Sequence, residues 1–202
     1  RVVFFFPLLP AGTDHIPHVG NGTGLRAWLQ EVTYWIRRQK VRNPRVSVSL
    51  GRCALTSFSA GATGLLDVVE SGGFQELREL FLLDPSDHNN SSDTSRARLV
   101  SSWSGNGRMW RVYTQYGSWL AALQHRFSTA PITGPASSTE WHTPETSLAF
   151  LPQPYWMAAT SHHGNLAQRA FEGSPINPNS VHQRIPQFFL QHALKNSGFA
   201  NA

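Results

Sequence analysis

The chain of 202 residues has a single cysteine and no apolar run long enough to cross a bilayer. One thiol, Cys53, excludes an internal disulfide, and its place inside an apolar segment predicts a buried side chain. A membrane-spanning helix needs roughly 18 to 20 apolar residues. The run from Val2 to Leu9 is too short for that, and it lacks the charged region and cleavage site of a signal peptide. We therefore expect a soluble protein, cytoplasmic or secreted, with no transmembrane segment.

Several other signatures are also missing. The formal net charge is +5 and the pI is near 10, yet no basic motif is interleaved with aromatic residues and no metal-finger spacing occurs. The one dense basic group follows a predicted helix, where it complements the helix dipole and faces solvent; it comprises Arg37, Arg38, Lys40, Arg42 and Arg45. Nucleic acid is thus not an expected partner.

The bulk composition fits one domain. The chain is 40% hydrophobic and 11% aromatic, which is enough for a buried core, and it has no internal repeat or low-complexity tract. We expect a single domain over residues 1–202, with residues 128–153 as a long loop that could cover a site. The first residue is Arg1 rather than Met, which suggests a processed or trimmed piece of a longer chain.

Apolar runs and helical patterns alternate along the chain. Strands are predicted at Val2–Phe6, Val46–Thr56 with a bend at Gly51, Leu80–Leu83, Trp110–Thr114 and Tyr155–Ala159, with a short strand at Ser147–Leu151 inside the long loop. Helices are predicted at Leu25–Arg38, Ala62–Val69, Ser95–Trp103 and Trp119–Phe127, and from Gln183 or Pro186 to Asn196; a polar loop is predicted at Ser86–Thr94. This alternation predicts an α/β fold with a mostly parallel sheet, helices on both faces and ligands at the carboxyl ends of the strands.

A serine stands where one of these strands runs into a helix. In a nucleophile elbow the central residue has a strained backbone at the tip of a strand, and the residues two places on either side are small. Ser59 is the central residue here, and Ser57 and Gly61 are its small neighbours. The backbone N–H of Ala60 opens the next helix, where it can help to bind an oxyanion. The alternative is an ordinary structural strand-to-helix turn.

Partners for this serine follow in the expected order. A serine hydroxyl needs an imidazole to take its proton and usually a carboxylate to orient that imidazole. Asp84 ends the strand after the elbow, on the same edge of the sheet as Ser59, and Asp87 is the second choice of acid. His163 and His162 lie in a glycine-containing loop after the last predicted strand; His163 is favoured because it directly precedes the glycine. Adjacent histidines without a suitably spaced partner do not indicate a metal site.

These features resemble the α/β-hydrolase superfamily from Val2 through the terminal helix. The Leu83-Asp84-Pro85 stretch is similar to the Leu-Asp-Pro stretch that carries the catalytic acid in pancreatic-type lipases, where the acid follows the strand after the nucleophile. The next strand here ends in Tyr113-Thr114-Gln115-Tyr116, with no carboxylate. Ser57 stands where the elbow of this superfamily usually has its first glycine. The two antiparallel strands that usually begin the fold are also lacking. The resemblance therefore implies a minimal or N-terminally truncated version of the fold.

The resemblance implies a serine esterase or lipase-like hydrolase that acts on a small-molecule or lipid ester and needs no cofactor. The second oxyanion donor would come from the loop after an early strand, where Leu8 or Leu9 can supply an N–H and the flanking prolines cannot. The alternative is a catalytically silent α/β-hydrolase-like domain used for binding or as a structural part. Acyltransferase or thioesterase chemistry would use the same residues.

Overall fold

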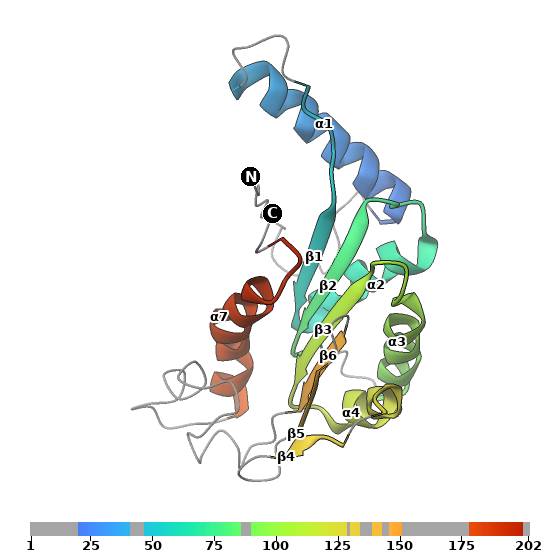
Figure 1. Cartoon of the computed structure of the whole chain (residues 1–202), viewed down its shortest axis with the longest axis vertical. Helices are drawn as coiled ribbons and strands as arrows, with labels where there is room; N and C mark the ends of the chain where they lie inside the picture. The colour runs from blue at the N-terminus through green and yellow to red at the C-terminus, as the bar shows by residue number, and fades with distance from the viewer. Residues whose placement is uncertain are drawn as a thin grey trace.

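The computed structural model describes residues 20–40, 47–85, 90–128, 130–133, 139–142, 146–150 and 178–199. These residues form a mixed α/β fold in which a twisted sheet is covered by helices on both faces (Figure 1). The helices are α1 (Gly22–Lys40), α2 (Ala62–Ser71), α3 (Asn90–Trp103), α4 (Gly117–Leu123) and α7 (Pro178–Lys195), with short 3-10 helices η1 (Ser59–Gly61) and η2 (Gln124–Arg126). The strands are β1 (Cys53–Phe58), β2 (Leu77–Leu83), β3 (Met109–Thr114), β4 (Ile132–Thr133), β5 (Thr139–His142) and β6 (Thr146–Phe150).

The sheet has the strand order β1-β2-β3-β6-β5-β4. β1, β2, β3 and β6 run parallel, and β5 and β4 add to the β6 side in antiparallel pairing. Each parallel connection carries a helix, as the predicted alternation requires: α2 joins β1 to β2, and α3 joins β2 to β3. The carboxyl ends of β1, β2 and β3 therefore lie side by side at one edge of the sheet.

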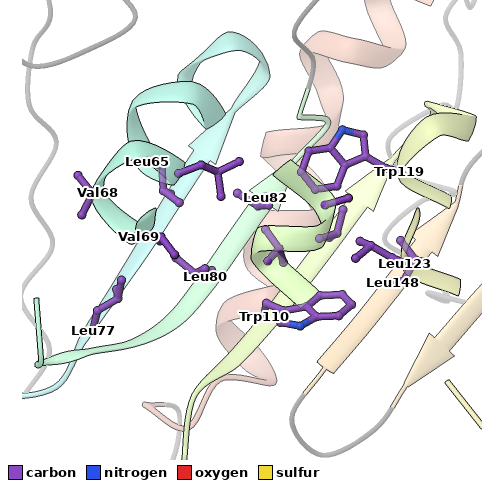
Figure 2. Close-up of a cluster of buried hydrophobic side chains, with 14 of the residues drawn as sticks. Leu65, Val68, Val69, Leu77, Leu80, Leu82, Trp110, Trp119, Leu123 and Leu148 are labelled. Atoms are coloured by element: carbon purple, nitrogen blue, oxygen red, sulfur yellow. The ribbon is translucent and has the colours of Figure 1, made fainter. Parts of the chain in front are cut away.

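One face of the sheet packs on α2, α3 and α4 (Figure 2). Side chains at alternate strand positions point to this face, because successive residues of a strand point to opposite sides. Leu80 and Leu82 from β2, Trp110 from β3 and Leu148 from β6 are all fully buried there. Trp119 and Leu123 of α4, and Leu65, Val68 and Val69 of α2, close the same cluster from the helix side. This cluster holds most of the apolar core.

The opposite face packs on α7 and is more polar. Tyr113 of β3 stacks on Phe189 of α7 with 5.0 Å between ring centroids, and its hydroxyl hydrogen-bonds to Nδ1 of His192 at 2.7 Å. The guanidinium of Arg111 donates to the carbonyl oxygen of Asn196 at 2.6 Å. The carboxylate of Glu79 accepts the N–H of Gly198 at 2.9 Å. These hydrogen bonds hold the turn after α7 against the sheet.

Helix α1 extends beyond the sheet and contacts α2 at its own N-terminus (Figure 1). Asn21 caps it through a 2.8 Å bond from the N–H of Gly24, and the N–H of Gly22 donates to Ser71 at the end of α2. An ion pair between Arg26 and Glu76 adds to this junction. None of the described helices is both long enough and apolar enough to cross a membrane.

The structure corrects several sequence expectations. Within residues 128–153 the structure has three strands where one was expected: the predicted strand at 147–151 is confirmed as β6, whereas β4 and β5 were not predicted. The segment is rich in proline and serine, so its local strand signal is weak, and the antiparallel pairing of β5 with β6 supplies the hydrogen bonds. Helix α3 begins at Asn90, inside the polar loop predicted for residues 86–94. Helix α7 begins at Pro178, since proline is tolerated in a first helical turn.

Two further predictions are wrong in detail. The predicted strand through residues 46–56 is shorter at its start and longer at its end: β1 begins only at Cys53 and runs to Phe58. Cys53 is half-buried rather than buried, because it is the first residue of a strand at the edge of the described sheet. The strands predicted at residues 2–6 and 155–159 lie outside the described residues.

Candidate functional site

Ser59 occupies the turn between β1 and α2. Its φ is 55°, in the left-handed region, while Phe58 before it is extended and Gly61 after it is helical. A left-handed conformation costs a residue other than glycine roughly 1 to 2 kcal/mol, and it persists only where the flanking structure holds it. Here the strand on one side and the η1–α2 helix on the other impose the reversal. Ser59 as a whole residue is half-buried.

Ser57 and Gly61, the small neighbours of Ser59, differ in their surroundings. The hydroxyl of Ser57 is buried and has no hydrogen-bond partner among the described residues. Gly61 has a helical φ of −60°, and no described atom lies within 4 Å of where a Cβ would sit. The described part of the chain therefore gives no steric reason for glycine at position 61, contrary to the expectation from the elbow pattern.

Asp84 directly follows β2 and is completely buried. Its φ of 47° is also left-handed, a conformation that aspartate adopts more readily than most residues. Its N–H donates to the carbonyl oxygen of Tyr113 at 2.7 Å, which continues the ladder to β3 by one residue. Its carboxylate accepts two hydrogen bonds from Gln115, one from the backbone N–H to Oδ1 at 3.0 Å and one from Nε2 to Oδ2 at 2.6 Å.

The register of β1 and β2 brings Ser59 and Asp84 to equivalent positions. Phe58 pairs with Leu83 as the last partners of the two strands, and the serine and the aspartate each come one residue later. Neighbouring strands are about 4.8 Å apart, so the two backbones lie next to each other at the carboxyl edge of the sheet. Both residues have a left-handed φ.

The other predicted members of the site are unevenly described. Ala60 is exposed and lies in the first turn of η1, where backbone N–H groups have no carbonyl to bond within the helix. His162, His163 and Asp87 lie outside the described residues, as do Leu8 and Leu9. The described residues thus place Ser59, Ala60 and Asp84, the predicted nucleophile, oxyanion donor and acid, at one edge of the sheet.

Thiol nucleophilicity and metal binding have little support among the described residues. Burial, reinforced by the nearby carboxylate of Glu76, raises the pKa of the Cys53 thiol to about 11, which leaves it protonated at neutral pH and a poor nucleophile. No group of three or more histidine, cysteine, aspartate or glutamate side chains within the described ranges could hold a metal ion. Arg37 and Arg38, from the basic group, are exposed at the end of α1, as predicted.

Gln115 is the member of this region that sequence reasoning missed. The segment that ends β3 has no carboxylate, so the sequence gives no reason to assign Gln115 a part in a catalytic triad. A glutamine in a turn is a common surface residue, and only the packing of β2 against β3 brings its amide to Asp84.

Comparisons with protein-family models, with curated proteins and with solved structures find no match to this chain.

Proposed function

We propose that this protein is a serine hydrolase of the α/β-hydrolase type that cleaves a carboxylic ester. Ser59 is the nucleophile, His163 the general base and acid, with His162 as the alternative, and Asp84 the carboxylate that orients the imidazole. The observation that carries the proposal is the left-handed backbone of Ser59 between a parallel strand and a helix. A nucleophile elbow has that geometry, and serine adopts a left-handed backbone less readily than aspartate or asparagine, the residue types of Asp84 and Asn106.

The position of Asp84 gives independent support. An orienting carboxylate must be buried, held in place and on the same edge of the sheet as the nucleophile. Asp84 is fully buried, its two carboxylate oxygens accept hydrogen bonds, and it follows the strand beside β1. Each carboxylate oxygen can accept two hydrogen bonds, so bonds from Gln115 and from an imidazole N–H are compatible.

The reaction follows from these roles. The imidazole removes the proton of the Ser59 hydroxyl as its oxygen attacks the ester carbonyl carbon, and the N–H groups of Ala60 and of Leu8 or Leu9 bind the resulting oxyanion. The imidazolium then protonates the leaving alcohol, and an acyl-enzyme forms on Ser59. Water, deprotonated by the same imidazole, hydrolyses the acyl-enzyme and restores the hydroxyl. No cofactor enters this cycle.

A fluorophosphonate probe tests the nucleophile directly, because it forms a stable bond only with an activated serine. We expect the wild type to be labelled and Ser59→Ala to be unlabelled. Ser57→Ala is the matched control: it removes a hydroxyl two residues earlier, on β1, that has no described hydrogen-bond partner, and labelling should persist. A folded wild-type sample that takes up no probe would instead support the catalytically silent domain. A series of p-nitrophenyl esters of increasing chain length then identifies the acyl group.

A further inference from the structure

Gln115 makes two hydrogen bonds to the same carboxylate, and both come from one residue at the end of β3. Its backbone N–H reaches Oδ1 of Asp84 at 3.0 Å and its side-chain Nε2 reaches Oδ2 at 2.6 Å. The N–H of Asp84 in turn donates to Tyr113, two residues before Gln115. The carboxylate is therefore held at two points and the Asp84 backbone at a third, and rotation of the carboxylate plane would break a hydrogen bond to Gln115.

We propose that Gln115 is a positioning residue that holds the carboxylate of Asp84 in the orientation in which it directs the catalytic imidazole. This inference rests on the proposed function. Catalysis through an oriented imidazole is sensitive to misplacement, since an error of about 1 Å can cost about a hundredfold in rate. The two bonds from Gln115, one to each carboxylate oxygen, restrict the χ1 and χ2 angles that Asp84 can adopt.

The chemistry of an amide suits this task. A neutral donor stabilises the ionised carboxylate through a hydrogen bond but leaves its negative charge to act on the imidazolium. An arginine in the same place would neutralise that charge, and a carboxylate would compete for a proton. Gln115 therefore supplies at the end of β3 a donor to the acid rather than the acid itself.

The competing interpretation is that the pair only ties the ends of β2 and β3 together. The two interpretations differ in which measured quantity changes when the side-chain amide of Gln115 is removed. A structural tie would alter the unfolding temperature and leave the turnover of folded protein unchanged. A positioning residue alters kcat with little change in KM, and its effect depends on the presence of the Asp84 carboxylate.

A double-mutant cycle tests the proposal on p-nitrophenyl ester hydrolysis, with each variant checked for its unfolding temperature. Gln115→Met keeps the volume and the backbone donor but removes Nε2, and we expect kcat to fall about 10- to 100-fold with KM within about twofold. Asp84→Asn should fall about 10⁴-fold, and Asp84→Asn combined with Gln115→Met should fall no further. Gln124→Met, the same change at an exposed residue of η2, should keep wild-type kcat.

A second variant gives a signature that a structural tie cannot produce. Gln115→Glu sets two carboxyl groups at hydrogen-bond distance, so the pair must share one proton. While the proton is held, the pair keeps its hydrogen bond and the enzyme its activity. We expect kcat of this variant to fall as the pH rises through the apparent pKa of the pair, along an alkaline limb that the wild type lacks.

The outcomes separate the two proposals. If Ser59→Ala abolishes activity and Asp84→Asn impairs it, but Gln115→Met has wild-type kcat, the positioning role is refuted and the proposed hydrolase stands. The positioning role is also refuted if the losses from Asp84→Asn and Gln115→Met multiply. If Ser59→Ala keeps full activity, or if Asp84→Asn does, the proposed triad itself fails and the role of Gln115 fails with it.

Discussion

Replacing Ser59 by glycine and by alanine measures the strain that the proposed elbow requires. Both changes remove the hydroxyl, so any difference between them comes from the backbone. At a φ of 55°, alanine keeps the cost of a left-handed conformation, roughly 1 to 2 kcal/mol, while glycine has almost none. Glycine in turn gives up about 0.5 to 1 kcal/mol through the larger entropy of its unfolded chain.

The balance favours glycine. We expect Ser59→Gly to be more stable than Ser59→Ala by about 0.5 to 1 kcal/mol, although neither variant should react with a fluorophosphonate. For a chain of this length such a difference raises the unfolding temperature by about 1 to 4 °C. Urea denaturation and thermal unfolding followed by circular dichroism both have the resolution to detect it.

Ser95 provides the control, because it is exposed and lies inside α3, where the backbone is helical. There the order should be reversed, with Ser95→Gly less stable than Ser95→Ala by about 1 kcal/mol. The contrary result is that the alanine variant is more stable than the glycine variant at position 59 by the same margin as at position 95. That result would mean that Ser59 is not held in a left-handed conformation and that the turn is not an elbow.

Three further predictions concern stability and reactivity away from the site. Leu82→Ala should lower the free energy of unfolding by about 2 to 5 kcal/mol, since Leu82 is fully buried between β2 and its covering helices; a loss below 1 kcal/mol in urea denaturation would contradict the packing. The hydrogen bond from Arg26 lowers the pKa of Glu76. The contribution of this ion pair to folding stability is therefore complete above the unfolded pKa of glutamate, about 4.3, and is lost as the pH falls through the lower pKa of the folded state. Arg26→Ala should therefore be less stable than the wild type at pH 6 and nearly equal to it at pH 2, and a pH-independent difference would count against this. With its pKa raised to about 11, the thiol of Cys53 should react with a disulfide reagent at pH 8 about a hundredfold more slowly in the folded protein than in denaturant; equal rates would refute the shift.

Much of the architecture follows from local patterns. The apolar run of Leu80–Leu83 and the helical spacing from Ala62 to Val69 each arise from neighbours within a few residues, and β2 and α2 form there. The short strand predicted at residues 147–151 is confirmed as β6, but its partner β5 could not be foreseen in the same way. β5 has only four residues, and it is stabilised by pairing with β6, which itself pairs with β3, more than thirty residues earlier in the chain.

The candidate site likewise has some features that local patterns predict and others that they do not. Local patterns alone place a serine after one strand and an aspartate after the next, because strand and helix periodicities are local and the two residues stand at their junctions. The left-handed backbone of both residues and the hydrogen bonds from Gln115 to the Asp84 carboxylate arise only in the folded protein. Strain at one residue and a hydrogen bond between separate strands exist only when the surrounding sheet and helices are packed, and no run of neighbouring residues encodes either of them.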